Sequence, residues 1–362
     1  MQRVNRSRLW AAMLLLGLGL STPGAAQVGT NAPPVVAGAK PVTIERIKVH
    51  APSIEGSLEG DSADRDVVVI LPPGYAAARH RRYPVVYALH GYSIGAEQWM
   101  TEIHVPQTVE GAFAQGIKPM ILVLPDSKTV HNGSMYSRSV TTGDFETFIA
   151  RDLVRYIDDH YRTVPTRESR GLAGHSMGGY GTTRIGMKYP DVFGAIYMLS
   201  PCCLSPRETF AVDQAVEAKL RALRSPGEAA TLGWGERAQL ASAAAWSPNP
   251  KAPPLFLDLP VKDGKVQPDV LARWTANAPL AMIDQYAGNL RRYRGIGLDV
   301  GDQDGLKDDA VKLHEALDRY GIAHRFAIYP GTHTSNVALR IQNQVLPFFS
   351  ETLVFPGEKS GR

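Results

Sequence analysis

Ser176 lies in the pattern Gly-x-Ser-x-Gly, which reads Gly174-His175-Ser176-Met177-Gly178 in this chain. A short apolar run from Arg170 precedes the pattern, and a helical pattern over residues 180–189 follows it. At a strand-to-helix junction, two flanking glycines permit a turn so sharp that other side chains there would collide with neighbouring elements. The pattern therefore predicts that Ser176 is a catalytic nucleophile. The alternative is a glycine-rich turn whose serine only caps a helix.

A serine hydroxyl needs a base that removes its proton and an acid that orients the base. When the nucleophile lies on such a turn, the acid and then the histidine follow it along the chain. His333 is the predicted base because its loop, Pro330-Gly331-Thr332-His333-Thr334, follows the last predicted strand. Asp304, in a loop that follows another strand, is the predicted acid, and Asp302 in the same loop is the alternative.

The attack of a serine on a carbonyl group creates a negative oxygen, which backbone amides must stabilise. The amide of Met177, directly after the nucleophile, is one predicted donor. The second is the amide of Tyr92, in the His90-Gly91-Tyr92 turn that ends a predicted strand. The alternative for this turn is a tight connection with no donor role.

Strand and helix patterns alternate along the chain, which predicts an α/β fold with a mainly parallel central sheet flanked by helices. The first strands follow one another through short links, so the sheet is expected to begin antiparallel. The predicted strands are 44–49, 66–71, 84–89, 120–124, 193–199, 296–300 and 325–329, and the predicted helices are 145–161, 180–189, 306–320 and 337–353.

The interval 204–293 is too long for a single crossover connection, and it contains three of the five tryptophans, Trp234, Trp246 and Trp274. Helical patterns cover 208–223 and 268–286, and strand patterns at 255–261 and 265–270 flank Asp263-Gly264, a hairpin signal. We predict a lid that builds the substrate pocket. The alternative is a structural excursion that packs on the core.

The first 26 residues are typical of a signal peptide, with three arginines, a short apolar run and small residues before Gln27. The apolar run is too short to cross a bilayer of about 30 Å, so no stable membrane insertion is expected. We predict cleavage after Ala26 and a periplasmic or secreted protein. Residues 27–41 read as a flexible linker, 42–355 as the catalytic domain and 356–362 as a tail.

The whole chain has 39 Lys and Arg against 35 Asp and Glu. Three of the arginines lie in the predicted signal peptide, so the rest of the chain is nearly neutral, which argues against nucleic-acid binding. The basic run Arg79-His80-Arg81-Arg82 is interpreted as a solvated loop.

The only cysteines, Cys202 and Cys203, are adjacent, so a disulfide bond between them would be strained, and they are interpreted as two small buried thiols. No metal or cofactor is implied.

These motifs resemble the putative-esterase group of the α/β-hydrolase superfamily, which includes esterase D-like S-formylglutathione hydrolases, feruloyl esterases and antigen 85 proteins. The similar segments are Gly-His-Ser-Met-Gly-Gly at 174–179, Leu-His-Gly-Tyr at 89–92 and the Gly-Thr-His sequence that ends at His333. The resemblance runs from about Val49 to Phe355. It implies an α/β-hydrolase fold with a triad of Ser176, Asp304 and His333, and oxyanion donors at Tyr92 and Met177.

The leading hypothesis is an exported serine carboxylesterase that hydrolyses a small-molecule or glycan-linked ester through an acyl-enzyme. An acyltransferase with the same triad is an alternative, as is a non-catalytic binding protein on a hydrolase fold. The sequence does not indicate which ester is used or the oligomeric state.

Overall fold

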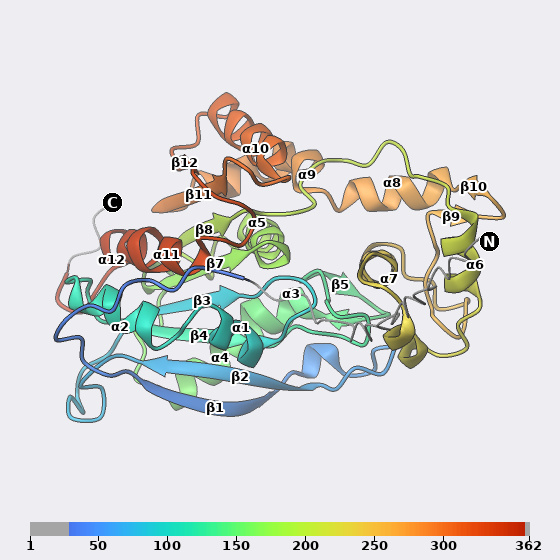
Figure 1. Ribbon diagram of the computed structural model, residues 1–362. Helices are drawn as coiled ribbons and strands as arrows, with labels where there is room; N and C mark the ends of the chain where they lie inside the picture. The colour runs from blue at the N-terminus through green and yellow to red at the C-terminus, as the bar shows by residue number, and fades with distance from the viewer. Residues whose placement is uncertain (1–28, 359–362) are drawn as a thin grey trace, which may run out of the picture.

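A single eight-stranded sheet organises the part of the chain that the computed structural model describes, residues 29–358 (Figure 1). The predicted signal peptide 1–26 lies outside the described residues. The strand order is β1-β2-β4-β3-β7-β8-β11-β12. Strand β2 pairs antiparallel with β1 and β4, and all later neighbours are parallel, as predicted. The strands are β1 Thr43–His50, β2 Asp64–Leu71, β3 Val85–Leu89, β4 Ile121–Pro125, β7 Arg170–His175, β8 Ala195–Leu199, β11 Gly295–Gly301 and β12 Arg325–Tyr329.

Both faces of this sheet are buried, because successive side chains of a strand point to opposite faces. In β2, Val67 and Val69 pack into the core on one face, while Val68 and Ile70 pack into the core on the other. Two-sided burial explains why these strands read as continuous apolar runs rather than as an alternating pattern.

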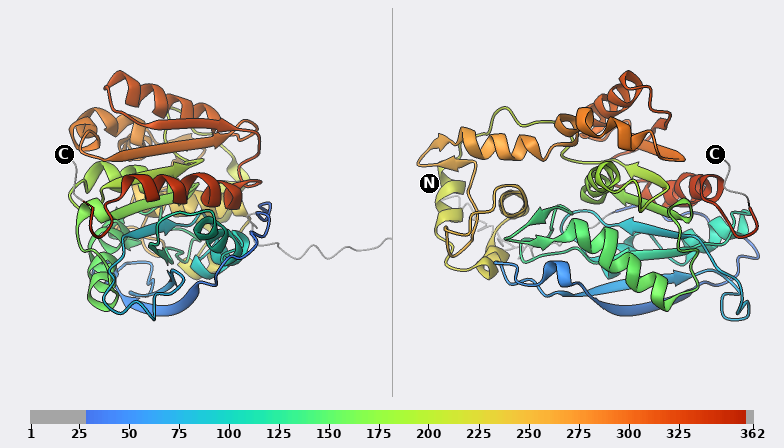
Figure 2. Two further views of the ribbon diagram at one scale, coloured as in Figure 1. Left: turned by 90° about the vertical axis from the view of Figure 1, so that its left-hand side faces the viewer. Right: turned by 180° about the vertical axis from the view of Figure 1, so that it is seen from behind.

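Helices cover each face (Figure 2). The face with Val68 is covered by α1 Ala96–Glu102, α2 Gln107–Ala114, α11 Val337–Arg340 and α12 Leu346–Thr352, the last two joined by a π-helical turn at Ile341–Val345. The opposite face is covered by α3 Phe145–Thr147, a π-helical turn Phe148–Asp152, α4 Leu153–His160, α5 Met177–Lys188, α9 Pro279–Leu290 and α10 Lys307–Arg319. The helices predicted at 145–161, 180–189, 306–320 and 337–353 are therefore confirmed, the first and last with a π-helical turn inside.

The segment between β8 and α9 forms a cap beyond the carboxyl ends of the parallel strands, at the right of Figure 1. Helix α7 packs against the β5–β6 region, where the Ser139 hydroxyl donates to the carbonyl of Ala244. The cap elements are α6 Gln214–Arg221, a 3-10 helix Pro226–Thr231, α7 Trp234–Trp246, β9 Val261–Lys262, β10 Lys265–Val266 and α8 Pro268–Ala276. Outside the cap lie β5 Arg138–Ser139, β6 Gly143–Asp144 and two short 3-10 helices, Pro52–Ile54 and Arg167–Ser169.

Three predictions for the interval 204–293 were wrong in detail. The helix predicted over 268–286 is two helices, because Pro279 has no amide hydrogen to continue α8 and instead begins α9. The helix predicted from residue 208 begins only at Gln214, where the Asp213 carboxylate accepts from the amides of Ala215 and Val216. The hairpin at Asp263-Gly264 is present, but its strands have two residues each instead of six or seven.

Two parts of the predicted insertion differ in what they contact. Helix α9 belongs to the layer that covers the sheet, since Asn289 donates to the carbonyl of Met187 in α5 at 2.7 Å. Tyr293 likewise donates to the carbonyl of Gly186 in α5 at 2.7 Å. The residues before α9, by contrast, make up the cap.

The described part of the predicted linker, residues 29–41, lies against the body of the protein. The Asn31 amide donates to the carbonyl of Ser335 at 2.7 Å, and Thr30 accepts from the amide of Ala338 at 3.1 Å. These contacts hold the segment beside the loop that carries His333. Among residues 29–358, no helix combines the length and the apolar character that crossing a membrane requires.

Candidate active site

Ser176 lies at the turn between β7 and α5 with a backbone φ of 58° and ψ of −115°. A Cβ atom on Gly174 would lie 2.2 Å from the carbonyl oxygen of Gly178. A Cβ atom on Gly178 would lie 2.1 Å from the carbonyl oxygen of Leu89. Real Cβ atoms do not approach backbone atoms so closely, so both positions require glycine. This is the sharp strand-to-helix turn that the sequence predicted.

The structure brings the three predicted triad residues together. The Nε2 atom of His333 lies 2.9 Å from the Ser176 hydroxyl oxygen, and its Nδ1 atom lies 2.8 Å from a carboxylate oxygen of Asp304. A carboxylate can only accept, so Nδ1 carries a proton and Nε2 of the neutral imidazole is free to accept one. Ser176 follows β7, Asp304 follows β11 and His333 follows β12, so all three lie at the carboxyl ends of parallel strands.

Asp302, the alternative acid, does not contact His333. Its carboxylate accepts a hydrogen bond from the amide of Gly331 at 2.9 Å, so it braces the loop that carries the histidine. Asp304 instead accepts from His333 and from the amide of Leu306 at 2.9 Å. The two acids of one loop therefore have separate partners.

Asp304 is held as a carboxylate. Burial opposes its ionisation, but the hydrogen bond and charge of His333, with the Leu306 amide, outweigh that effect and hold its pKa below the ordinary value. Its side chain is only 2% exposed, whereas that of His333 is 33% exposed. The imidazole thus faces solvent and substrate, while the acid lies behind it.

Two buried histidines position these loops, and the sequence analysis assigned neither a role. His175 lies 2.8 Å from the carbonyl oxygen of His333 through Nε2, so it donates a hydrogen bond to the backbone of that loop. Burial lowers the pKa of His175 to about 3, so it stays neutral near pH 7. His90 accepts from the amide of Ser127 through Nε2 and donates to the Gly91 carbonyl through Nδ1, both at 2.8 Å. Each histidine lies next to a predicted site residue, Ser176 or the oxyanion turn, which is the signal that could have indicated it.

The predicted oxyanion donors lie next to the hydroxyl. Met177 is the first residue of α5, and the turn that contains Tyr92 passes so close that a Cβ atom on Gly91 would contact Ser176 at 3.5 Å. Among residues 29–358, no hydrogen bond uses the amide of Tyr92 or of Met177. Both amides are therefore available to a bound oxygen.

A cavity of about 490 Å³ opens above Ser176 between the sheet and the cap. Its walls are mostly apolar and aromatic. Trp234 is 59% exposed at the rim, with its ring 5.3 Å from that of Tyr92, and it begins α7, a helix that the sequence analysis missed. The alanine-rich run after Gly233-Trp234 was the signal for this helix. The main side chains of the wall are Tyr92, Met135, Phe210, Trp234, Trp274 and Leu306.

Of the three cap tryptophans, Trp234 and Trp274 line the cavity, and Trp246 packs against Trp274.

Cys202 and Cys203 are free thiols whose sulfur atoms lie 2.9 Å apart. They also line the cavity and are half-buried, so the interpretation of two buried thiols was wrong. The chain turns at Cys203, which has a φ of 57°, and both cysteines line the cavity.

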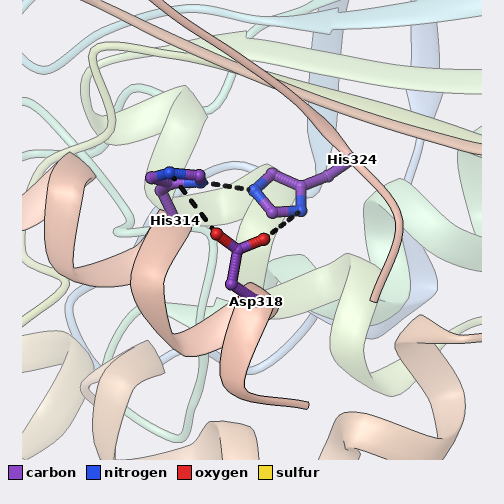
Figure 3. Close-up of side chains that lie close together, drawn as sticks. All are labelled: His314, Asp318 and His324. Atoms are coloured by element: carbon purple, nitrogen blue, oxygen red, sulfur yellow. Dashed lines mark hydrogen bonds and ion pairs between the residues drawn. The ribbon is translucent and has the colours of Figure 1, made fainter. Parts of the chain in front are cut away.

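A second group of titratable side chains consists of His314, Asp318 and His324, which lie close together (Figure 3). None of the three lines this cavity. His324 donates through Nδ1 to the carbonyl of Ile322 at 2.8 Å, so its Nε2 atom accepts from Nδ1 of His314 at 2.7 Å. Asp318 lies 3.5 Å from the remaining nitrogen of His314. This group is a hydrogen-bonded histidine pair beside an aspartate, at the end of α10 and before β12 begins.

Comparison with known proteins identifies the family. The model described as "Putative esterase" matches residues 62–337, most of the chain. This chain belongs to the putative esterase family. Its central sheet, the sharp turn at Ser176 and the flanking helices form the α/β-hydrolase fold. A solved ferulic acid esterase superimposes with a TM-score of 0.62 at 21% identity, over 86% of this chain and 99% of that one.

Two curated relatives match a shorter region. An endo-1,4-beta-xylanase/feruloyl esterase of Xylanibacter ruminicola is 31% identical over 144 residues, which are 39% of this chain and 20% of that protein. An esterase of Mycobacterium tuberculosis is 32% identical over 134 residues, which are 36% of this chain and 27% of that protein. This chain thus matches about a fifth to a quarter of the length of these relatives.

Proposed function

We propose that this chain is a serine carboxylesterase in which Ser176 is the nucleophile, His333 the base and Asp304 the orienting acid. One observation carries the proposal: a single imidazole lies within hydrogen-bond distance of the Ser176 hydroxyl at 2.9 Å and of the Asp304 carboxylate at 2.8 Å. Membership of an esterase family and the names of the relatives support the same reaction class.

In the first half of the reaction, Nε2 of His333 accepts the hydroxyl proton as Ser176 attacks the carbonyl carbon of the ester. The carbonyl oxygen becomes an oxyanion, and the amides of Tyr92 and Met177 stabilise it. The buried carboxylate of Asp304 stabilises the imidazolium that forms. The tetrahedral intermediate then collapses, and His333 gives its proton to the departing alcohol.

In the second half, water replaces the alcohol. His333 removes a proton from the water, which attacks the acyl group on Ser176 and releases the carboxylic acid. His333 is 33% exposed on its side chain, which supports direct access of water to Nε2. That access favours hydrolysis over transfer of the acyl group to another alcohol.

The walls of the cavity favour an ester with an aromatic or other large apolar group. Phe210, Trp234 and Trp274 line it, and aromatic side chains of this kind bind flat apolar groups well. Two of the compared proteins are named for feruloyl or ferulic acid esters, which carry such a group. We therefore include hydroxycinnamoyl esters among the proposed substrates.

We also propose that the protein acts after export. The arginines, apolar run and small residues of the first 26 positions support this. Fractionation of the producing cells, with sequencing of the mature amino terminus, tests it: export predicts a chain that begins at Gln27 outside the cytoplasm. A full-length chain retained in the cytoplasm would contradict it.

The central test compares the wild-type protein with the Ser176→Ala variant. We expect the wild type to hydrolyse 4-nitrophenyl acetate and methyl hydroxycinnamates and to react once with a fluorophosphonate probe. The variant should lose both properties while its circular dichroism spectrum is unchanged. Labelling or turnover that persists in the folded variant would show that another nucleophile acts.

A further inference from the structure

The wall of the active-site cavity contains one unpaired cation. Of the described residues that line the cavity, only Arg207 carries a permanent charge, and none is a carboxylate. Among residues 29–358, no acid forms an ion pair with Arg207. Two other arginines of the cap do form ion pairs: Arg221 with Asp263 and Arg273 with Asp258.

Arg207 is held in place by its neighbours. Its guanidinium carbon lies 5.5 Å from the centre of the Trp274 ring, and its backbone carbonyl accepts from the hydroxyl of Thr275 at 3.3 Å. Trp274 is itself fixed, because it is buried and its indole donates to Ser247 at 2.9 Å. An arginine stacked on a fixed ring keeps its planar N–H groups available to a third partner.

The charge of Arg207 acts on the cavity wall. The hydrogen bond with Cys202 lowers the pKa of the Cys203 thiol, and the positive charge of Arg207 lowers it further. Cys203 lines the same cavity as Ser176. Arg207 lines this wall as well, so its positive charge would interact with a ligand bound in the cavity.

We propose that Arg207 is an anion-binding subsite, which selects esters that carry a carboxylate in addition to the scissile bond. This inference rests on the proposed function, because it names the class of substrate for the same site. A guanidinium binds a carboxylate through two parallel N–H···O bonds, and the surrounding apolar walls strengthen that attraction. The carboxylate could be on the acyl group or on the alcohol, so the test has an arm for each.

The experiment uses two matched pairs of esters. For the acyl side, the mono-4-nitrophenyl ester of glutaric acid is compared with its neutral methyl ester. For the alcohol side, 4-acetoxybenzoate is compared with methyl 4-acetoxybenzoate. In each pair, the ratio of kcat/KM for the charged ester to that for the neutral ester is measured for each variant and divided by the wild-type ratio, so the difference in intrinsic reactivity between the two esters cancels.

In at least one pair, we expect the Arg207→Ala variant to lower this ratio by about 10- to 100-fold. The Arg207→Lys variant should retain part of the preference, and added salt should reduce the preference of the wild type, because Arg207 is exposed. The control variant Arg221→Ala, which removes an exposed cap arginine outside the cavity, should leave both ratios unchanged. The pair that responds identifies the end of the substrate that contacts Arg207.

Unchanged ratios in both pairs would overturn the anion subsite while Ser176-dependent hydrolysis still supported the proposed function. An equal fall for charged and neutral esters would also overturn it, since that result indicates a structural role for Arg207. If the wild type hydrolysed none of the four esters or the 4-nitrophenyl acetate standard, the proposed function would fail first.

Discussion

The carboxy-terminal part of the chain contains two groups in which histidine and aspartate side chains lie together. In the first, His333 joins Asp304 to Ser176 at the carboxyl ends of the parallel strands. In the second, His314 and His324 contact each other and lie near Asp318, where α10 ends and before β12 begins. The two groups contain similar side chains, yet among residues 29–358 only the first adjoins the Ser176 hydroxyl, two unused amides and the 490 Å³ cavity. The two groups differ in their surroundings and not in their side chains, so we expect reactivity only in the first group.

The topology explains why the two groups are separate. Helix α10 connects the carboxyl end of β11 to the amino end of β12, so its own two ends lie at opposite ends of the parallel strands. The loop before α10 places Asp304 at the carboxyl ends of the strands, where ligands bind in such sheets. The turn after α10 places His324 at the amino ends of the strands. One connection therefore supplies a residue to each group.

The largest expected effect comes from the nucleophile. Ser176→Ala should lower kcat by about 10⁴-fold or more, because no other hydroxyl lies within hydrogen-bond distance of His333 in the described chain. Steady-state hydrolysis of 4-nitrophenyl acetate measures this loss. A folded variant that kept a tenth of the activity would exclude Ser176 as the nucleophile.

The next largest effect is expected from a comparison of two histidine variants. His333→Ala should lower kcat by about 10³-fold or more, whereas His314→Ala should leave kcat within about twofold, since the partners of His314 in the described chain, such as His324 and Phe326, do not line the cavity. Both variants are compared at equal concentrations of folded protein. A large loss of kcat in the His314 variant would remove the functional distinction between the groups.

The acids offer a third, smaller comparison. Asp304→Asn should lower kcat by about 10²- to 10⁴-fold, because an amide can donate to Nδ1 and favour the wrong tautomer of His333. Asp318→Asn should have almost no effect on kcat, because Asp318 is 63% exposed and distant from the serine. Equal effects in the two variants would contradict the assignment of Asp304.

Asp304 should also affect the stability of the protein. The folded-state pKa of Asp304 is below its unfolded value, so its ionisation stabilises the protein above the unfolded pKa of about 3.9. This contribution is lost as the pH falls through the folded pKa. The difference in unfolding free energy between wild type and Asp304→Asn should therefore shrink below about pH 4, as measured by urea unfolding.

A further prediction concerns the buried histidine beside the nucleophile. Burial lowers the pKa of His175 to about 3, so below about pH 6.5 only the unfolded chain takes up this proton. Stability should then fall with pH from about 6.5 towards 3, by about 1.4 kcal/mol for each pH unit from this residue. The His175→Gln variant, which keeps a donor near the Nε2 position, should show a shallower fall with kcat changed less than tenfold. An unchanged pH dependence of stability would show that His175 does not carry this linkage.

The smallest effect is expected from His324, whose side chain is 3% exposed. His324→Ala removes hydrogen bonds to Ile322 and His314 and should lower the unfolding free energy by about 1–3 kcal/mol. The kcat of the folded fraction should stay within about twofold. We therefore expect variants of the His314–His324 group to be less stable, and variants of the Ser176–His333–Asp304 group to have a lower kcat.

The sequence by itself determined the elements and the order of the reactive residues. Buried parallel strands read as apolar runs, and Gly174 and Gly178 are required wherever the chain makes so sharp a turn. The order of Ser176, Asp304 and His333 along the chain was sufficient to predict which loops meet. These signals are local, because each arises from the steric needs of a few neighbouring residues.

Only the tertiary structure decided the rest. Asp302 and Asp304 lie in one loop, and the backbone path around Gly331 determines which carboxylate reaches His333. The contact of the Trp234 ring at the start of α7 with Tyr92 and the placement of Arg207 on the Trp274 ring depend on contacts between distant segments. Such contacts have no local pattern, because they form only when the cap packs over the sheet.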